Sequence, residues 1–141
     1  MECRLYLEAA PRGTDYAPDE CVDLEHLWEV MNFLLTGKRE SDGSVANLLV
    51  EDWPDFGGSE AARINAEALS AFGNWLAGQT DDAILSRFDP SAMIASEVYG
   101  ASTIAFNPAS ARENLARILT SLRAFADRGA QIGSAAIRVI N

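Results

Sequence analysis

Apolar residues recur along this chain at two different spacings, and each spacing is typical of a different kind of element. Polar and apolar residues alternate near both ends, which predicts strands at residues 3–7 and in the C-terminal tail QIGSAAIRVIN. Apolar residues three or four positions apart predict helices through the middle of the chain. The expected helices cover residues 24–36, 66–78, 80–87, 90–98 and 108–129, and a brief strand is expected at 61–65. We therefore predict an α/β fold, a single helix-rich domain over residues 1–141 with a small sheet that includes the N- and C-terminal strands.

The helix expected at residues 24–36 has the clearest start and stop. Asp23 is a candidate N-cap, because its carboxylate can accept hydrogen bonds from the free backbone N–H groups of the first turn. Gly37 suits the left-handed position that follows the last turn. Apolar residues lie on two sides of this helix, which is typical of a helix that is covered twice. The side chains predicted to be mostly buried are Leu27, Trp28, Met31 and Leu35.

Capping signals delimit the later helices. Thr80 is a candidate N-cap, and Asp89 and Asn107 are each followed by a proline, which suits the first helical position. Gly129 is expected to end the long helix that begins after Asn107. Residues 38–60 hold few regular signals and are expected to be the loosest part of the chain.

The net charge of −10 is concentrated in the first half of the chain. Residues 1–60 hold fourteen acidic and four basic residues, whereas residues 61–141 hold seven of each. Nucleic acids and anionic membranes require a basic surface, so neither is expected as a partner. An acidic segment can steer a basic protein partner into contact. The alternative is that the charge serves only solubility.

Nothing in the sequence predicts export or membrane insertion. No run approaches the roughly 20 apolar residues that span a bilayer, and the N-terminus MECRLYLEAAPRG lacks the pattern of a signal peptide. Cys3 and Cys21 form no CxxC motif and are too few for a disulfide framework. We therefore expect two reduced thiols in a cytoplasmic protein.

The chain has few residues suited to catalysis or metal binding. Its one histidine, His26, is expected on the second face of the first helix, away from other ligands. One histidine and two separated cysteines are too few for a zinc-type site, and neither a GxSxG motif nor a phosphate-binding loop occurs. We expect no cofactor, no metal and no catalytic residue.

Carboxylates and aromatic residues are the remaining candidates for binding. Glu25, Glu29 and Glu97 meet only if the segments around them pack together, and they are otherwise a solvated acidic face. Trp53 and Phe56 lie in an acidic loop, either as an exposed anchor for a partner or as a lid on the core. The candidate ligand- or partner-binding residues are Trp28, Glu29, Asn32, Trp53, Phe56, Glu97 and Tyr99.

Two segments, DLEHLWEVMNFLLTG at 23–37 and RFDPSAMIASEVYG at 87–100, resemble the YfbM-like family of uncharacterised bacterial proteins. The shared features are the Asp-Leu start, the Trp, and the closing Leu-Thr-Gly in the first segment, and the Asp-Pro, the Met and the Glu-hydrophobic-Tyr in the second. The resemblance covers roughly residues 20–141. It implies an α/β fold and a bacterial cytoplasmic setting, and it implies no particular reaction. This chain departs from the family at Glu29 and Asn32, where histidine is frequent, and at Gly100, where proline is usual.

These features together favour a binding protein over an enzyme. We expect a small cytoplasmic protein that neutralises a basic partner, such as an immunity protein that blocks a bacterial toxin. The alternative is a small-molecule-binding or hydrolytic domain with a carboxylate and tyrosine cleft. The first requires acidic groups and aromatic residues on an open face, and the second requires them in a concave pocket.

Overall fold

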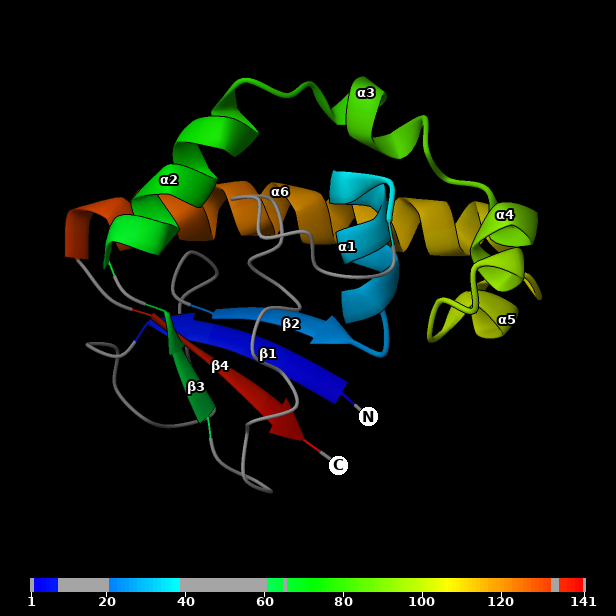
Figure 1. Cartoon of the computed structure of the whole chain (residues 1–141), viewed down its shortest axis with the longest axis horizontal. Coiled ribbons are helices and arrows are strands. Elements are labelled where there is room, and N and C mark those ends of the chain that lie inside the picture. Colours follow the sequence, from blue (N-terminus) through cyan, green and yellow to red (C-terminus); the bar gives the residue numbers. More distant parts are fainter. Residues whose placement is uncertain (1, 8–20, 39–60, 65, 133–134, 141) are drawn as a thin grey trace.

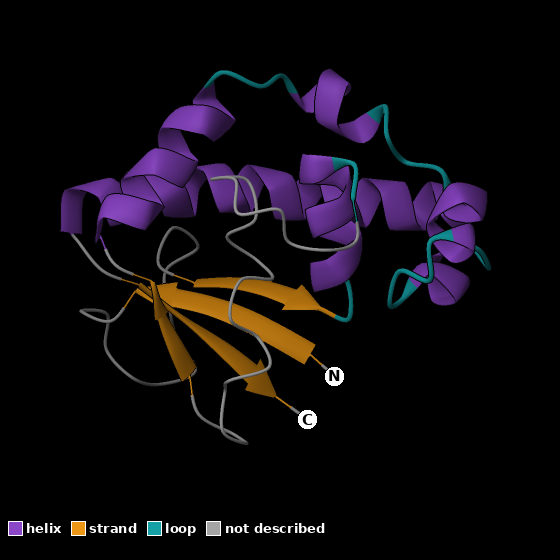
Figure 2. Ribbon diagram, viewed as in Figure 1, coloured by secondary structure: helices purple, strands orange, loops and turns teal. Residues whose placement is uncertain are grey.

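The helices of this protein lie together on one side of a small antiparallel sheet, as its computed structural model shows (Figure 1 and Figure 2). The structure describes residues 2–7, 21–38, 61–64, 66–132 and 135–140, and six helices and four strands lie within these ranges. The domain is mostly helical. The longest helix lies across the sheet, and the other helices pack around it (Figure 1).

The sheet contains the strands β1 (Glu2–Leu7), β2 (Cys21–Glu25), β3 (Ala61–Ile64) and β4 (Ala135–Ile140). Their order across the sheet is β2-β1-β4-β3, and every neighbouring pair is antiparallel. The first and last strands therefore pair directly at the centre, in a register that runs from Glu2 opposite Ile140 to Leu7 opposite Ala135. The two ends of the chain lie close together at one end of the sheet (Figure 1).

Two of the helices begin where a polar side chain accepts from a free backbone N–H group. Thr80 Oγ1 accepts from the Ala83 N–H at 3.1 Å, and Asp89 Oδ1 accepts from the Ala92 N–H at 3.1 Å. These two predicted N-caps are confirmed. The helices are α1 (Trp28–Thr36), α2 (Ala66–Ala77), α3 (Asp81–Leu85), α4 (Pro90–Ala95), α5 (Ala101–Ile104) and α6 (Pro108–Ile132).

The prediction of a single helix over residues 24–36 is wrong at its start. Residues 21–25 form β2, in which Val22 and Leu24 are buried while Asp23 is exposed. That alternation is the pattern of a half-buried strand. Asp23 is therefore not an N-cap: it pairs with Arg4 of β1 at 3.1 Å.

The predicted end of α1 is confirmed. Gly37 has a φ of +75° and donates its N–H to the Phe33 carbonyl oxygen at 2.7 Å. A left-handed residue in this position satisfies a carbonyl that the helix itself leaves free. Only glycine adopts this conformation without steric cost.

Two later boundaries also differ from the sequence prediction. The helix expected to reach residue 98 ends at Ala95, and the separate helix α5 follows after a turn in which Glu97 has a φ of +58°. The long helix α6 continues through Gly129, which is buried. Glycine inside a helix costs about 1 kcal/mol relative to alanine. The turn before Gly129 is held in the core by Phe125 and Ala126, which are both buried.

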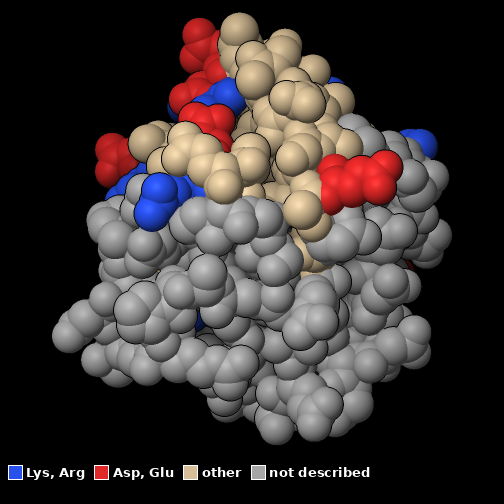
Figure 3. All heavy atoms as spheres, turned by 90° about the vertical axis from the view of Figure 1, so that its left-hand side faces the viewer, with Lys and Arg blue, Asp and Glu red and all other residues tan. Residues whose placement is uncertain are grey.

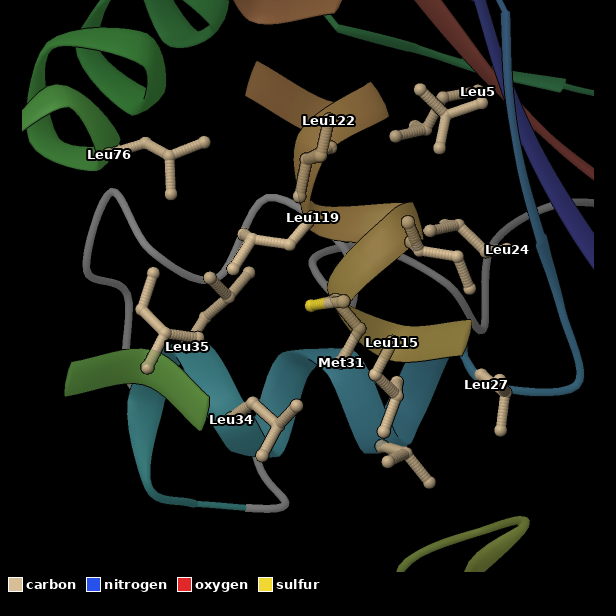
Figure 4. Packing of buried hydrophobic residues seen from close by; sticks show 14 of the residues in the cluster. Leu5, Leu24, Leu27, Met31, Leu34, Leu35, Leu76, Leu115, Leu119 and Leu122 are labelled. Carbon is tan, nitrogen blue, oxygen red and sulfur yellow. The ribbon is translucent and has the colours of Figure 1, made fainter. Parts of the chain in front are cut away.

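The core lies where α1 meets α6 above the sheet (Figure 4). Met31 and Leu35 of α1 are buried as predicted, and so is Leu27. Trp28 is partly buried and packs against this core without being fully enclosed by it. The leucines that contribute to this core from the other elements include Leu5, Leu24, Leu76, Leu115, Leu119 and Leu122.

Candidate functional site

A pocket of about 430 Å³ lies at the corner where β2 turns into α1. Its lining residues include Glu25 and His26 from this corner, Gly100 and Thr103 from the start of α5, and Glu113 of α6. Pockets of this size are typical of sites for small ligands or for single side chains of a partner. His26 was expected on a helix face, and it lies instead in the turn before α1.

Close backbone contact holds this corner together. Gly100 has a φ of +85°, and a Cβ atom added to it would lie 2.8 Å from the His26 carbonyl oxygen. Any side chain at this position would therefore collide with the turn. Proline, whose φ is held near −65°, cannot adopt this backbone conformation either. Gly100 is thus required for the segment before α5 to close onto the turn that carries His26.

Hydrogen bonds among the lining residues of the pocket connect β2 to α6. Asn114 Nδ2 donates to Glu25 Oε2 at 3.4 Å, and Arg117 donates to Asn114 Oδ1. A second, smaller pocket of about 270 Å³ shares these three residues and extends to Cys21 and Ser121. The two pockets therefore adjoin the same three polar side chains of β2 and α6.

The Cys21 thiol, which lines the smaller pocket, is held in its protonated form. Burial raises its pKa above the ordinary value and is the largest effect. The positive charge of Arg4 lowers the pKa in part, and the negative charge of Asp23 raises it further. Because the thiolate is the nucleophilic form of cysteine, this environment does not activate Cys21 for catalysis.

Three of the predicted binding residues meet one another but are not lining residues of the pocket. Glu29 is 9% exposed, and its carboxylate accepts a hydrogen bond from the backbone N–H of Tyr99. The rings of Trp28 and Tyr99 stack with their centroids 5.7 Å apart. These contacts attach α1 to the turn between α4 and α5. They use Glu29 to position the backbone.

The other predicted residues do not join this contact in the same way. Asn32 is fully buried and donates to the Lys38 carbonyl oxygen at 3.5 Å, near the end of α1. Glu97 is exposed in the turn after α4. Trp53 and Phe56 lie outside the described residues. None of the five predicted residues that the structure describes lines the 430 Å³ pocket.

Sequence reasoning missed the contribution of α6 to the pocket. Ser110, Glu113, Asn114 and Arg117 are spaced three or four positions apart or adjacent, so they share one face of that helix. This polar face was visible in the sequence next to the apolar stripe. What it faces depends on how α6 packs, because the turn carrying His26 is about 85 residues earlier in the chain.

Three large apolar side chains in the described part of the chain are exposed, and they all lie in residues 94–106. Ile94 is 47% exposed, Tyr99 41% and Phe106 91%. We call these three residues the α4–α5 surface. Phe106 precedes Asn107, whose Oδ1 accepts from the Ser110 N–H at 3.3 Å as the N-cap of α6. An apolar residue in that position often packs onto the first turn of the helix, and the exposure of Phe106 shows that its ring does not.

Charge is nearly balanced over the described residues. They contain eleven acidic and nine basic residues, a net charge of −2 out of −10 for the whole chain. On the face shown in Figure 3, acidic and basic side chains of the described residues are interspersed. Most of the predicted acidic excess, including Glu51, Asp52 and Asp55, lies outside the described residues.

No group of three or more His, Cys, Asp or Glu side chains in the described ranges is arranged to hold a metal ion. The helices described here are also too short or too polar for any of them to cross a lipid bilayer.

Comparison with known proteins gives one family. Residues 4–139 match the model of a domain of unknown function, DUF1877. Neither a curated protein nor a solved structure matches the chain.

Proposed function

The chain belongs to the DUF1877 family, whose function is unknown, and we propose that it is a binding protein that docks a basic protein partner through the α4–α5 surface. The observation that carries this proposal is the exposure of Phe106, at 91%. Large aromatic side chains that are exposed in the free protein are frequent anchors in protein interfaces. Ile94 and Tyr99 are further exposed large apolar side chains of the same segment.

The chemistry of the partner follows from the charge of the chain. A net charge of −10 favours a basic protein, which is attracted over a distance before contact. The small size of the chain and its resemblance to the YfbM-like bacterial proteins support an immunity protein that neutralises a basic toxin in the cytoplasm. Binding alone is sufficient for that role, so it agrees with Glu29 acting as a positioning group and with Cys21 being protonated.

Affinity capture with matched columns tests this proposal. Wild-type protein, the Phe106→Ser variant and an Ala83→Ser control are immobilised, and the basic proteins that each retains are quantified. Ala83 is exposed on α3, away from the α4–α5 surface. The retained partner, once purified, should bind the Phe106→Ser variant about tenfold more weakly than the wild type, as expected for loss of an aromatic anchor. Equal affinity for both would overturn the docking surface.

A small-molecule-binding or hydrolytic domain is the second candidate. It is supported by the contact of Glu29 with the Tyr99 backbone, which places a carboxylate beside a phenol-bearing residue. It ranks second because that carboxylate is buried and already accepts a backbone hydrogen bond. A ligand that raises the melting temperature of the wild type, and fails to do so for Tyr99→Phe, would reverse the order.

A further inference from the structure

We propose that the 430 Å³ pocket receives an arginine side chain of the protein partner. This inference rests on the proposed function and names the group that the partner inserts. The pocket lies beside the α4–α5 surface, since Gly100, Thr103 and Asn107 line it and are interleaved in sequence with Tyr99 and Phe106. A partner anchored on Phe106 therefore has the pocket within reach.

The charges that line the pocket favour a cation. Glu25 and Glu113 are exposed carboxylates, and no ion pair joins either of them to a basic residue in the described part of the chain. Arg117 and His26 also line the pocket, and Arg117 donates to Asn114. An anionic ligand would face two carboxylates against one guanidinium, whereas a cationic ligand would pair with both carboxylates.

The remaining lining suits the rest of an arginine side chain. Leu27 and Ile104 are apolar wall residues of the pocket, and both are largely buried. Arginine packs its methylene groups along such walls while its charged end meets polar groups. Its guanidinium has five N–H donors, and carboxylate acceptors are available from Glu25 and Glu113, which belong to different elements. A compact ammonium group would use fewer of these acceptors.

Nuclear magnetic resonance titration of the full chain tests this inference without the partner. The probe is Nα-acetyl-arginine amide, and the control is the citrulline analogue, which keeps the shape and lacks the charge. The arginine probe should shift the backbone amides of Thr103, Asn107 and Asn114 with saturation, and citrulline should bind at least about tenfold more weakly. Inorganic phosphate should leave these amides unchanged.

Variants identify the groups responsible. Glu25→Gln and Glu113→Gln should each weaken binding of the arginine probe about tenfold, because each removes a charged acceptor. Glu67→Gln, an exposed glutamate on α2, is the matched control and should bind as the wild type does. Both pocket residues are exposed, so the variants should keep the wild-type melting temperature. Equal shifts with arginine and citrulline, or shifts produced by phosphate, would overturn the inference.

The same titration separates this inference from the proposed function. Phe106→Ser should leave the affinity for the arginine probe within about twofold of the wild type, since Phe106 is not a lining residue of the pocket. If the probe binds and the partner is indifferent to Phe106→Ser, the docking surface is wrong and the pocket stands. If the partner requires Phe106 and the probe does not bind, the arginine assignment is wrong and the docking surface stands.

Discussion

Glu29 is a carboxylate enclosed at the junction of α1 with the turn before α5. It is 9% exposed and accepts a hydrogen bond from the Tyr99 N–H. A buried carboxylate is tolerated where it receives such bonds, because an unpaired polar group in the interior is costly. The Tyr99 N–H depends in turn on Glu29.

Glu29→Ala is therefore expected to destabilise the protein by about 1–3 kcal/mol, because it leaves the Tyr99 N–H without its acceptor. Glu29→Gln keeps an acceptor oxygen and should cost less. Glu97→Gln, at an exposed position nearby, should change the free energy of unfolding by less than about 0.5 kcal/mol. Urea unfolding measures all three. A Glu29→Ala variant as stable as Glu97→Gln would show that the hydrogen bond is not needed.

Cys21 gives a prediction about pH. Its pKa is raised in the folded protein, chiefly by burial, so the folded state keeps the thiol proton at a pH where the unfolded chain loses it. The stability from this difference is fully present below the unfolded pKa and is lost as pH rises through the folded pKa. In a Cys3→Ser background, the stability advantage over a Cys21→Ser variant should shrink as pH is raised into the alkaline range.

Alkylation gives an independent measure of the same shift. At pH 8, Cys21 should react with iodoacetamide more slowly than a free thiol, because less thiolate is present. The rate should rise with pH along a curve whose midpoint lies above that of unfolded protein in urea. A midpoint below that of the unfolded protein would contradict the raised pKa.

At the scale of elements, an arginine side chain on the long helix α6 links this helix to the segment between α2 and α3. Arg123 of α6 donates to the Leu76 carbonyl oxygen at 2.8 Å and to the Gln79 carbonyl oxygen at 2.6 Å. It also pairs with Asp81 at 2.8 Å. The two carbonyls lie at and just after the end of α2, where helix carbonyls have no partner within the helix. Asp81 is the first residue of α3. One guanidinium thus joins three elements.

Arg123→Met is expected to lower the free energy of unfolding by about 2 kcal/mol, because it retains most of the apolar stem and removes the donors. Arg123→Lys should recover only part of the loss, since an ammonium cannot reproduce the planar fork. Arg112→Met, at an exposed position of the same helix, is the control and should be nearly neutral. Equal stability of the two methionine variants would refute the role of Arg123.

The boundary between β2 and α1 shows why the ends of an element are harder to predict from sequence than the kinds of element present. In residues 21–27, Val22 and Leu24 fit the period of a strand, and Leu24 and Leu27 fit the period of a helix. Pairing with β1 decides between them, because Arg4 lies opposite Asp23 in the register of the sheet. That partner is about twenty residues away in the sequence, so local pattern alone favours the wrong element.

At the scale of the whole molecule, the charge of the chain is expected to act on the rate of association. Replacing Glu51, Asp52 and Asp55 with lysine should reduce affinity for the basic partner, mainly through a slower on-rate. Added salt should weaken wild-type binding steeply. Trp53→Ala should cost more affinity than any single reversal, as loss of an aromatic anchor usually does. Surface plasmon resonance at two salt concentrations measures both effects. If the triple variant binds the partner normally at low salt, the uneven charge of the chain serves solubility and not binding.

The sequence by itself determined the helix-rich character of the domain and the helix ends that are set by local capping residues. Thr80 and Asp89 as N-caps and Gly37 as the left-handed end of α1 are interactions within four residues, so the local sequence is sufficient to predict them. The burial of Leu69, Phe72 and Leu76 follows in the same way from the period of α2.

Only the tertiary structure decided the pairing of β1 with β4, the identity of residues 21–25 as a strand, and the pocket. Glu25 comes from an edge strand, Gly100 from a turn and Glu113 from α6. Each belongs to a different local pattern, and none of these patterns specifies the distance to the others. That distance is set by how α1 and α6 pack over the sheet, because side-chain volumes across the core determine it and no contiguous segment contains them.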